Sequence, residues 1–202
     1  MDVKLTYSDV KLTYSIVQIG PCNFWAIPKC GNTTIKYLLF KKYQSRSVRS
    51  LDNEANEWVH LETIGNYITP LDANNNGKYN FTVVRDPVER FKSLYSDFCM
   101  VRKDAIQEIE GMSVDQLITY ISKAENEKDL NIHLRSQMYF LKAFRGDVFN
   151  LADLDLPQKL NQTNTTIELT DSQKERILKM WEPDLTFLEK CSNIQLLLPH
   201  IS

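Results

Sequence analysis

The pattern of hydrophobic and polar positions predicts short buried strands that alternate with amphipathic helices. Apolar, β-branched or aromatic runs of strand length lie at 23–27, 79–84 and 147–151. Apolar residues recur at helical spacing over 34–43, 88–98, 113–124, 133–144 and 170–181. This alternation is typical of an α/β domain with a central, mainly parallel sheet flanked by helices. No segment resembles a linker, so we expect a single domain over 23–202 that follows an extension over 1–22.

The strand predicted at 79–84 runs directly into the start of a helix. Asp86 suits the N-cap, Pro87 the first helical position and Glu89 the third, which together predict a capping box. A hydroxyl residue followed three positions later by glutamine likewise opens the helices predicted at 113–124 and 170–181.

The N-terminus holds a perfect tandem repeat, in which DVKLTYS at 2–8 recurs at 9–15. Because seven is odd, the apolar residues of the two copies fall on opposite faces of a continuous strand, and one flat strand cannot bury both. A hairpin, a bulge or a dispensable copy resolves the conflict. We interpret the repeat as a duplication without a functional role. The polar stretches 45–56 and 72–77 predict a surface excursion and a turn.

The composition is ordinary for a folded domain and excludes several classes of protein. The chain has 202 residues, of which 43% are hydrophobic and 25% charged, so disorder is not its dominant state. A net charge of −2 argues against nucleic-acid binding. No apolar run approaches the roughly 20 residues that span a bilayer, and the start is not a secretory signal. We therefore expect a soluble, cytoplasmic protein without membrane insertion.

The four cysteines and three histidines show no spacing typical of a metal site. Reduced thiols are the simpler expectation for a cytosolic protein of this size. We therefore expect no metal.

A candidate anion site lies where the strand at 23–27 gives way to a helix. Backbone N–H groups at a helix N-terminus bind phosphate or sulfate, and a glycine lets the anion approach closely. Lys29 adds a positive charge, and two threonine hydroxyls add hydrogen-bond donors. We predict that this loop holds an anion through Lys29, Cys30, Gly31, Asn32, Thr33 and Thr34.

Two other interpretations of this loop remain open. The pattern G-x-x-x-x-G-K-[ST] is absent because the lysine precedes the glycine, so a plain turn with a surface lysine has the same spacing. A cysteine-based phosphatase would use Cys30 as its nucleophile. That enzyme needs an arginine six positions later, where this chain has Lys36.

A second candidate anion site follows the strand at 79–84. Arg85 lies where the strand ends, and Ser93 lies eight residues further on in the next helix. Parallel strands end at one crevice, so this site is expected to meet the Lys29 loop. Two anion sites on one crevice suggest a nucleotide with phosphates on both sides of its ribose. In the alternative interpretation Arg85 pairs only with Asp86 or Glu89, and Ser93 is a solvated helix position.

The two segments resemble motifs of the sulfotransferase family. PKCGNTT at 28–34 looks like the family's 5′-phosphosulfate loop, and RDPVERFKSLY at 85–95 looks like its 3′-phosphate motif. HLRSQ at 133–137 and a terminal helix with Trp181 and Asp184 follow in the expected order. The resemblance covers roughly 24–188 and is closest to the carbohydrate, Golgi-type branch. The chain lacks the membrane anchor of that branch, and Ser136 replaces a proline that is often found there.

The resemblance implies the sulfotransferase fold, with a P-loop-like central sheet, and an enzyme dependent on 3′-phosphoadenosine 5′-phosphosulfate (PAPS). Such an enzyme moves a sulfuryl group from PAPS to a hydroxyl or amine, here with a saccharide as the expected acceptor and without a metal. Lys29 would hold the 5′-phosphate and stabilise the leaving oxygen. Arg85 and Ser93 would fix the 3′-phosphate.

The acceptor's proton needs a general base, and a neutral imidazole suits this role near pH 7. His60 lies between the two donor motifs, in the interval where several carbohydrate sulfotransferases carry their base, so we rank it first. Glu57 and Glu62 are alternatives. His133, the other catalytic candidate, matches a histidine-containing segment of the family and would contact donor or acceptor.

Two further functions remain open. A non-catalytic nucleotide-binding module of the same fold would keep the donor site without turnover. A kinase-like phosphotransferase is disfavoured, because both the G-K-[ST] motif and a clear magnesium ligand are missing.

Overall fold

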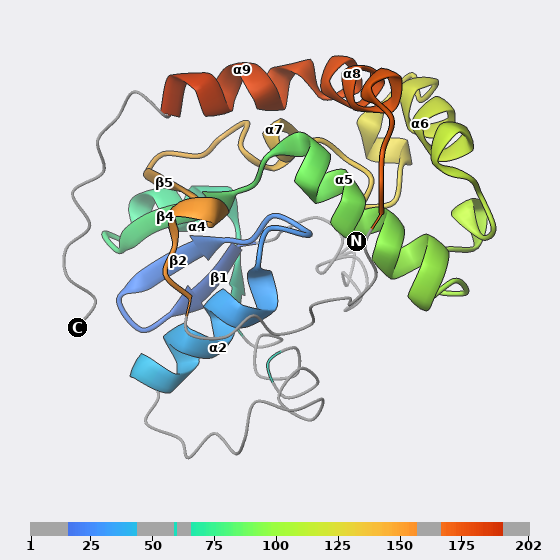
Figure 1. Cartoon of the computed structure of the whole chain (residues 1–202). Coiled ribbons are helices and arrows are strands. Elements are labelled where there is room, and N and C mark those ends of the chain that lie inside the picture. Colours follow the sequence, from blue (N-terminus) through green and yellow to red (C-terminus); the bar gives the residue numbers. More distant parts are fainter. Residues whose placement is uncertain (1–15, 44–58, 60–65, 157–166, 192–202) are drawn as a thin grey trace, which may run out of the picture.

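The computed structural model describes residues 16–43, 59, 66–156 and 167–191, and Figure 1 shows their arrangement. Its strands form a five-stranded sheet in the order β3-β1-β2-β4-β5. They are β1 (Ile16–Ile19), β2 (Cys22–Trp25), β3 (Tyr67–Ile68), β4 (Tyr79–Val84) and β5 (Asp147–Asn150). The tandem repeat and the polar segment 45–56 lie outside the described residues.

The sheet is mixed, and its two halves differ in strand direction. Strand β1 pairs antiparallel with β2 and β3, whereas β2, β4 and β5 run parallel to one another. Strand β1 falls within 1–22, the segment that the sequence assigns to an extension, and yet it belongs to the sheet. The predicted α/β class is confirmed, and its parallel part is the half that carries the candidate anion motifs.

Helices flank the sheet and account for the amphipathic segments of the sequence. In the view of Figure 1, α2 lies below the sheet, and α8 and α9 run end to end across the top. The helices are α2 (Asn32–Tyr43), α4 (Pro70–Asn75), α5 (Pro87–Tyr95), α6 (Val114–Ser122), α7 (Gln137–Phe140), α8 (Asp171–Met180) and α9 (Glu182–Cys191). Short 3-10 helices cover Gln107–Ile109, Glu127–Asp129 and Leu151–Asp153.

The largest hydrophobic cluster lies between α5, α6 and α8. Phe91, Leu117 and Trp181 are buried there with their neighbours, as burial of apolar surface predicts for the inner faces of amphipathic helices. This cluster fixes α5, which begins directly after the parallel strand β4. The position of α5 matters because it carries the second candidate anion motif.

The start of α5 follows the sequence-based prediction in part. Asp86 is the N-cap and accepts a hydrogen bond from the backbone N–H of Glu89 (2.9 Å), and Pro87 is the first helical residue. The Glu89 carboxylate does not close the predicted capping box; it pairs with Lys92 at 2.7 Å instead. After Tyr95 the chain continues as a π-helical segment, Ser96–Val101.

Two local predictions are wrong. Residues 72–77 are not simply a turn, because Thr69 and Asp72 form a capping box that starts α4. The helix expected over 133–144 shrinks to α7. Buried Asp184 accepts hydrogen bonds from the backbone N–H groups of Gln137 (2.8 Å) and Met138 (2.9 Å), and so fixes a helix start four residues later than the apolar pattern indicates.

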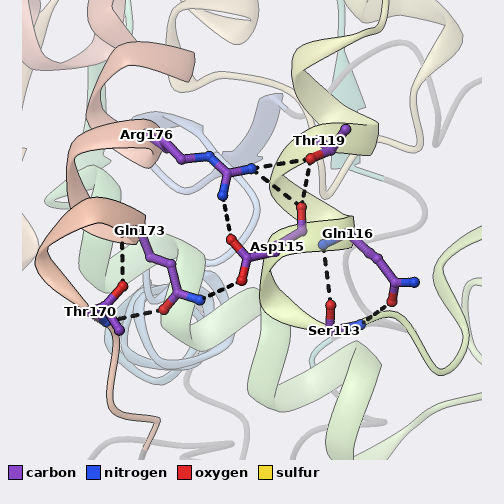
Figure 2. A network of polar contacts seen from close by, with 7 residues as sticks. All are labelled: Ser113, Asp115, Gln116, Thr119, Thr170, Gln173 and Arg176. Atoms are coloured by element: carbon purple, nitrogen blue, oxygen red, sulfur yellow. Dashed lines mark hydrogen bonds and ion pairs between the residues drawn. The ribbon is translucent and has the colours of Figure 1, made fainter.

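The capping boxes predicted for α6 and α8 are both present, and Figure 2 shows that they belong to one polar network. Asp115 of α6 pairs with Arg176 of α8 and accepts a hydrogen bond from Gln173 at 2.9 Å. Arg176 also donates to Thr119 at 3.1 Å. This exposed network joins the two helices at the surface.

Candidate functional site

The Lys29 loop joins β2 to α2 and has an unusual backbone. Lys29 has φ 69°, the one positive φ of a non-glycine residue in the described chain. Gly31 has φ 76°, and a Cβ built on it would lie 2.8 Å from Leu151. The first hydrogen bond of α2 runs from Ile35 N–H to the Gly31 carbonyl (3.0 Å), so the helix N-terminus follows the loop directly. A lysine with positive φ three residues before a helix N-terminus is consistent with the predicted anion site.

The Lys29 ammonium is mostly buried and is paired with a carboxylate. Its Nζ lies 2.6 Å from Asp97 Oδ2 and 5.2 Å from the centre of the Phe98 ring. Arg102 also binds Asp97, with Nε–Oδ1 at 2.7 Å. Burial lowers the pKa of Lys29, and the bond to Asp97 opposes that shift. The lysine is therefore held in place while its environment disfavours its charge.

Arg85 meets the same loop, as the parallel sheet predicts. Its Nη1 donates to the Lys29 carbonyl at 3.4 Å, and its Nη2 lies 3.9 Å from Glu89. Gln137 fixes the Arg85 backbone twice: the amide oxygen accepts from Arg85 N–H (2.9 Å), and the amide nitrogen donates to the Arg85 carbonyl (2.8 Å). The two candidate anion motifs therefore meet at one edge of the sheet.

Arg90 acts as a buried connector beneath this edge. It is fully buried and donates to the Pro28 carbonyl (3.1 Å) and to the Arg135 carbonyl (2.7 Å). Its guanidinium lies 4.7 Å from the centre of the Trp181 ring. Helix α5 thus holds Pro28, the residue that precedes Lys29, through a fully buried side chain.

Cys30 is not placed to act as a nucleophile. Its thiol is fully buried and donates to the Gln137 amide oxygen at 3.2 Å. Burial raises its pKa to about 12, so the thiolate that a cysteine-based phosphatase requires does not form near neutral pH. The structure therefore contradicts the phosphatase interpretation, and Cys30 contributes to the loop through packing and its backbone.

His133 lies beside the lysine cluster. Its ring centre is 4.6 Å from that of Phe98, and its buried Nδ1 has no hydrogen-bond partner among the described residues. Burial and the nearby charges of Lys29 and Arg90 lower its pKa to about 3. The imidazole is therefore neutral at physiological pH and binds protons weakly.

Four other predicted residues belong to the two helices that follow the candidate motifs. Asn32, Thr33 and Thr34 form the first turn of α2. Ser93 is half-buried on α5, one helical turn before Asp97. His60, with Glu57 and Glu62, lies outside the described residues.

The sequence-based prediction missed three side chains that organise this region: Asp97, Arg102 and Gln137. Asp97 lies four residues after Ser93, but it belongs to the π-helical segment, so α-helical spacing does not predict its position. Gln137 lies in the segment HLRSQ, which resembles the family, but its contact with Arg85 spans 52 residues of sequence. No local pattern indicates a contact at that separation.

Comparison with known proteins assigns the family. Residues 23–144 match the model of the sulfotransferase family, and this match includes the Lys29 loop and the Arg85 segment. The chain belongs to the sulfotransferase family, whose general chemistry is the transfer of a sulfuryl group to a hydroxyl or similar acceptor. No curated protein and no solved structure is similar enough to this chain to add to that assignment.

The described residues contain neither a membrane-spanning helix nor a cluster of metal-ligating side chains. No described helix combines the length and apolar character needed to cross a bilayer. Within the same residues, no group of three or more His, Cys, Asp or Glu side chains is placed to hold a metal ion.

Proposed function

We propose that this protein transfers a sulfuryl group from PAPS to a hydroxyl group, with a saccharide as the acceptor. The observation that carries the proposal is the meeting of two cationic motifs, in which Arg85 donates to the carbonyl of Lys29. PAPS has a phosphosulfate on its 5′ side and a phosphate on its 3′ side. Two adjacent anion sites match that distribution of charge.

The residues of the loop fit the 5′ group of such a donor. Lys29 brings the ammonium, and the helix N-terminus after Gly31 brings oriented amides. Arg85 and Ser93 lie on the other motif and would hold the 3′-phosphate. PAPS would supply an activated sulfuryl group, and the surrounding residues supply position and charge stabilisation.

In the transfer one S–O bond forms, another S–O bond breaks, and one proton leaves the acceptor. The acceptor oxygen bonds to sulfur while the bond from sulfur to the 5′-phosphate oxygen breaks. The bond's electrons stay on the departing phosphate, where Lys29 stabilises the charge that develops. The acceptor's proton goes to a base. Adenosine 3′,5′-bisphosphate and the sulfated acceptor are the products.

His60 is our first choice for that base. The alternative histidine, His133, has a pKa lowered to about 3, which makes it a weak base. His60→Ala should lower kcat by about 10²–10⁴ and remove the acidic limb of the pH–rate profile. A variant with the parental rate and an unchanged acidic limb would move the role to Glu57, Glu62 or His133.

The transfer itself is tested with labelled PAPS. The parent protein is incubated with [³⁵S]PAPS and a panel of neutral and anionic oligosaccharides, tyrosine peptides and small alcohols. We expect labelled oligosaccharide from the parent, and label formed about 10²–10³ times more slowly by Lys29→Ala. Label on peptide or alcohol alone would contradict the saccharide assignment. Binding of PAPS without transfer to any acceptor would favour the non-catalytic module.

A further inference from the structure

Three charged side chains form a short chain beside the proposed donor site. The carboxylate of Asp97 lies 2.6 Å from Lys29 Nζ, and it accepts from Arg102 at 2.7 Å and 2.5 Å. Asp97 is buried, whereas the side chain of Arg102 is more than half exposed. Both cations also lie over the Phe98 ring, at 5.2 Å and 4.9 Å. The lysine is thus fixed from one side by a carboxylate that is itself fixed.

The backbone places this carboxylate by an irregular turn of helix. Asp97 and Phe98 belong to the π-helical segment that follows α5, and Arg102 N–H closes the turn on the Asp97 carbonyl at 2.7 Å. A π-helical turn costs hydrogen-bond geometry and occurs preferentially at functional sites. Here it gives Asp97 its place against a loop that lies 68 residues earlier in the sequence.

The charges around Lys29 are mostly positive. Arg102 from the π-helical segment and Arg85 from the end of β4 both act to lower its pKa, and His133 nearby is neutral. Among the residues that the structure describes, Asp97 is the carboxylate that opposes them. Without Asp97, burial and two guanidinium groups would lower the pKa of Lys29 with no described carboxylate to oppose them.

We propose that Asp97 is a positioning residue for sulfuryl transfer: its carboxylate, 2.6 Å from Lys29 Nζ, holds the ammonium in place. Arg102 in turn orients Asp97. This inference rests on the proposed function, in which Lys29 stabilises the leaving oxygen. The π-helical segment, which lies outside both phosphate motifs, thereby gains a role in the reaction.

The first test follows the charge of Lys29 directly. The Lys29 signal is observed by NMR in protein labelled with ¹³C-lysine, is assigned by its loss in Lys29→Arg, and is titrated with pH. Asp97→Asn keeps the size of the side chain but removes its charge, so the pKa of Lys29 should fall. Arg102→Gln removes both a repelling cation and the hydrogen bonds that orient Asp97. A fall in the pKa of Lys29 would support the orienting role, and a rise would show that the lost repulsion outweighs it and would contradict that role. Asp171→Asn, at an exposed ion pair of α8, is the matched control and should leave the titration unchanged.

The second test separates positioning from a merely structural role. Asp97→Asn should lower kcat by about 10²-fold, since a small misplacement of a reacting group has that effect. Its alkaline limb should move to lower pH, because Lys29 loses its proton sooner. Binding of adenosine 3′,5′-bisphosphate should be as tight as in the parent or tighter, because an anion has been removed from an anion site.

The outcomes distinguish a failure of the role proposed for Asp97 from a failure of the proposed sulfotransferase function. Parental titration and parental kcat in Asp97→Asn would overturn the inference. So would an equal loss of kcat and of bisphosphate affinity together with a lower Tm, which would indicate a purely structural role. If the parent protein does not bind the bisphosphate, the proposed function fails and takes the catalytic role of Asp97 with it. The NMR titration still shows in that case whether Asp97 sets the charge of Lys29.

Discussion

Two clusters of charged side chains in this molecule have similar chemistry and opposite surroundings. The pair Asp115–Arg176 joins α6 to α8 at the surface, and its side chains are 58% and 41% exposed. The pair Lys29–Asp97 lies at the edge of the sheet, and its side chains are 15% and 12% exposed. Water screens the first pair, so its contribution to stability is small. The second pair has lost most of its hydration, which is a cost that packing alone does not explain.

The comparison shows which polar contacts of the fold point to function. In the surface network every polar group either caps a helix or links two helices. These contacts within the fold explain the network without a ligand. In the buried cluster Lys29 has a strained backbone and a lowered pKa. A strained backbone and a charge that burial disfavours do not stabilise the fold. Both fit a site in which a bound anion pairs with Lys29.

Of the effects expected at these two clusters, the largest is on catalysis through Lys29. Lys29→Ala should lower kcat by about 10²–10³, because the lysine stabilises charge that grows in the transition state. Lys174→Ala removes a lysine from the exposed pair with Asp171 and should leave kcat as in the parent. The rates of the two variants are measured with the best acceptor of the panel. Equal rates would show that the buried lysine matters no more for catalysis than an exposed one.

The next effect is on donor binding through Arg85. Arg85→Ala should weaken the binding of adenosine 3′,5′-bisphosphate by about 1.5–3 kcal/mol, because a charge-assisted contact is lost. Isothermal titration calorimetry measures this directly. Parental affinity would mean that Arg85 does not bind the 3′-phosphate and contacts only Glu89 and the Lys29 carbonyl.

Ser93 sharpens the same comparison with a neutral group. Ser93→Ala should weaken bisphosphate binding by about 0.5–1.5 kcal/mol, since one uncharged donor is lost. The same titration, run beside Arg85→Ala, ranks the two contacts. A loss for Ser93→Ala that exceeds the loss for Arg85→Ala would reverse the roles proposed for the two residues.

The smallest effect is expected at the surface network. Arg176→Ala should lower the free energy of unfolding by about 0.2–1 kcal/mol, as is usual for exposed ion pairs. Urea denaturation measures that loss. Bisphosphate binding should not change, and a weaker affinity in this variant would show that the α6–α8 network supports the site.

Local patterns were sufficient to predict much of this fold. The strand at 79–84, the N-cap at Asp86 and the capping boxes of α6 and α8 depend on neighbours within four residues, and all are present. The helix predicted over 133–144 was placed too early, because the distant carboxylate of Asp184 binds the backbone N–H of Gln137 and fixes a later start. Apolar spacing describes which face is buried and carries no information about such a partner.

The candidate site divides in the same way. The positions of Lys29, Gly31 and Arg85 follow from strand ends and helix starts, which the sequence displays. Asp97 and Gln137 reach the site through contacts that span 68 and 52 residues, and a π-helical turn is needed to place the first of them. Periodicity at 3.6 residues does not predict that turn.

The central claim is that the edge of the sheet at Lys29 and Arg85 binds a nucleotide with phosphates on both its 3′ and 5′ sides. Isothermal titration of the parent protein with adenosine 3′,5′-bisphosphate, and separately with ATP, tests it most directly. We predict saturable binding of the bisphosphate, and binding of ATP at least about tenfold weaker, because ATP has no 3′-phosphate for Arg85 and Ser93 to hold. Tight binding of ATP without binding of the bisphosphate would contradict the account.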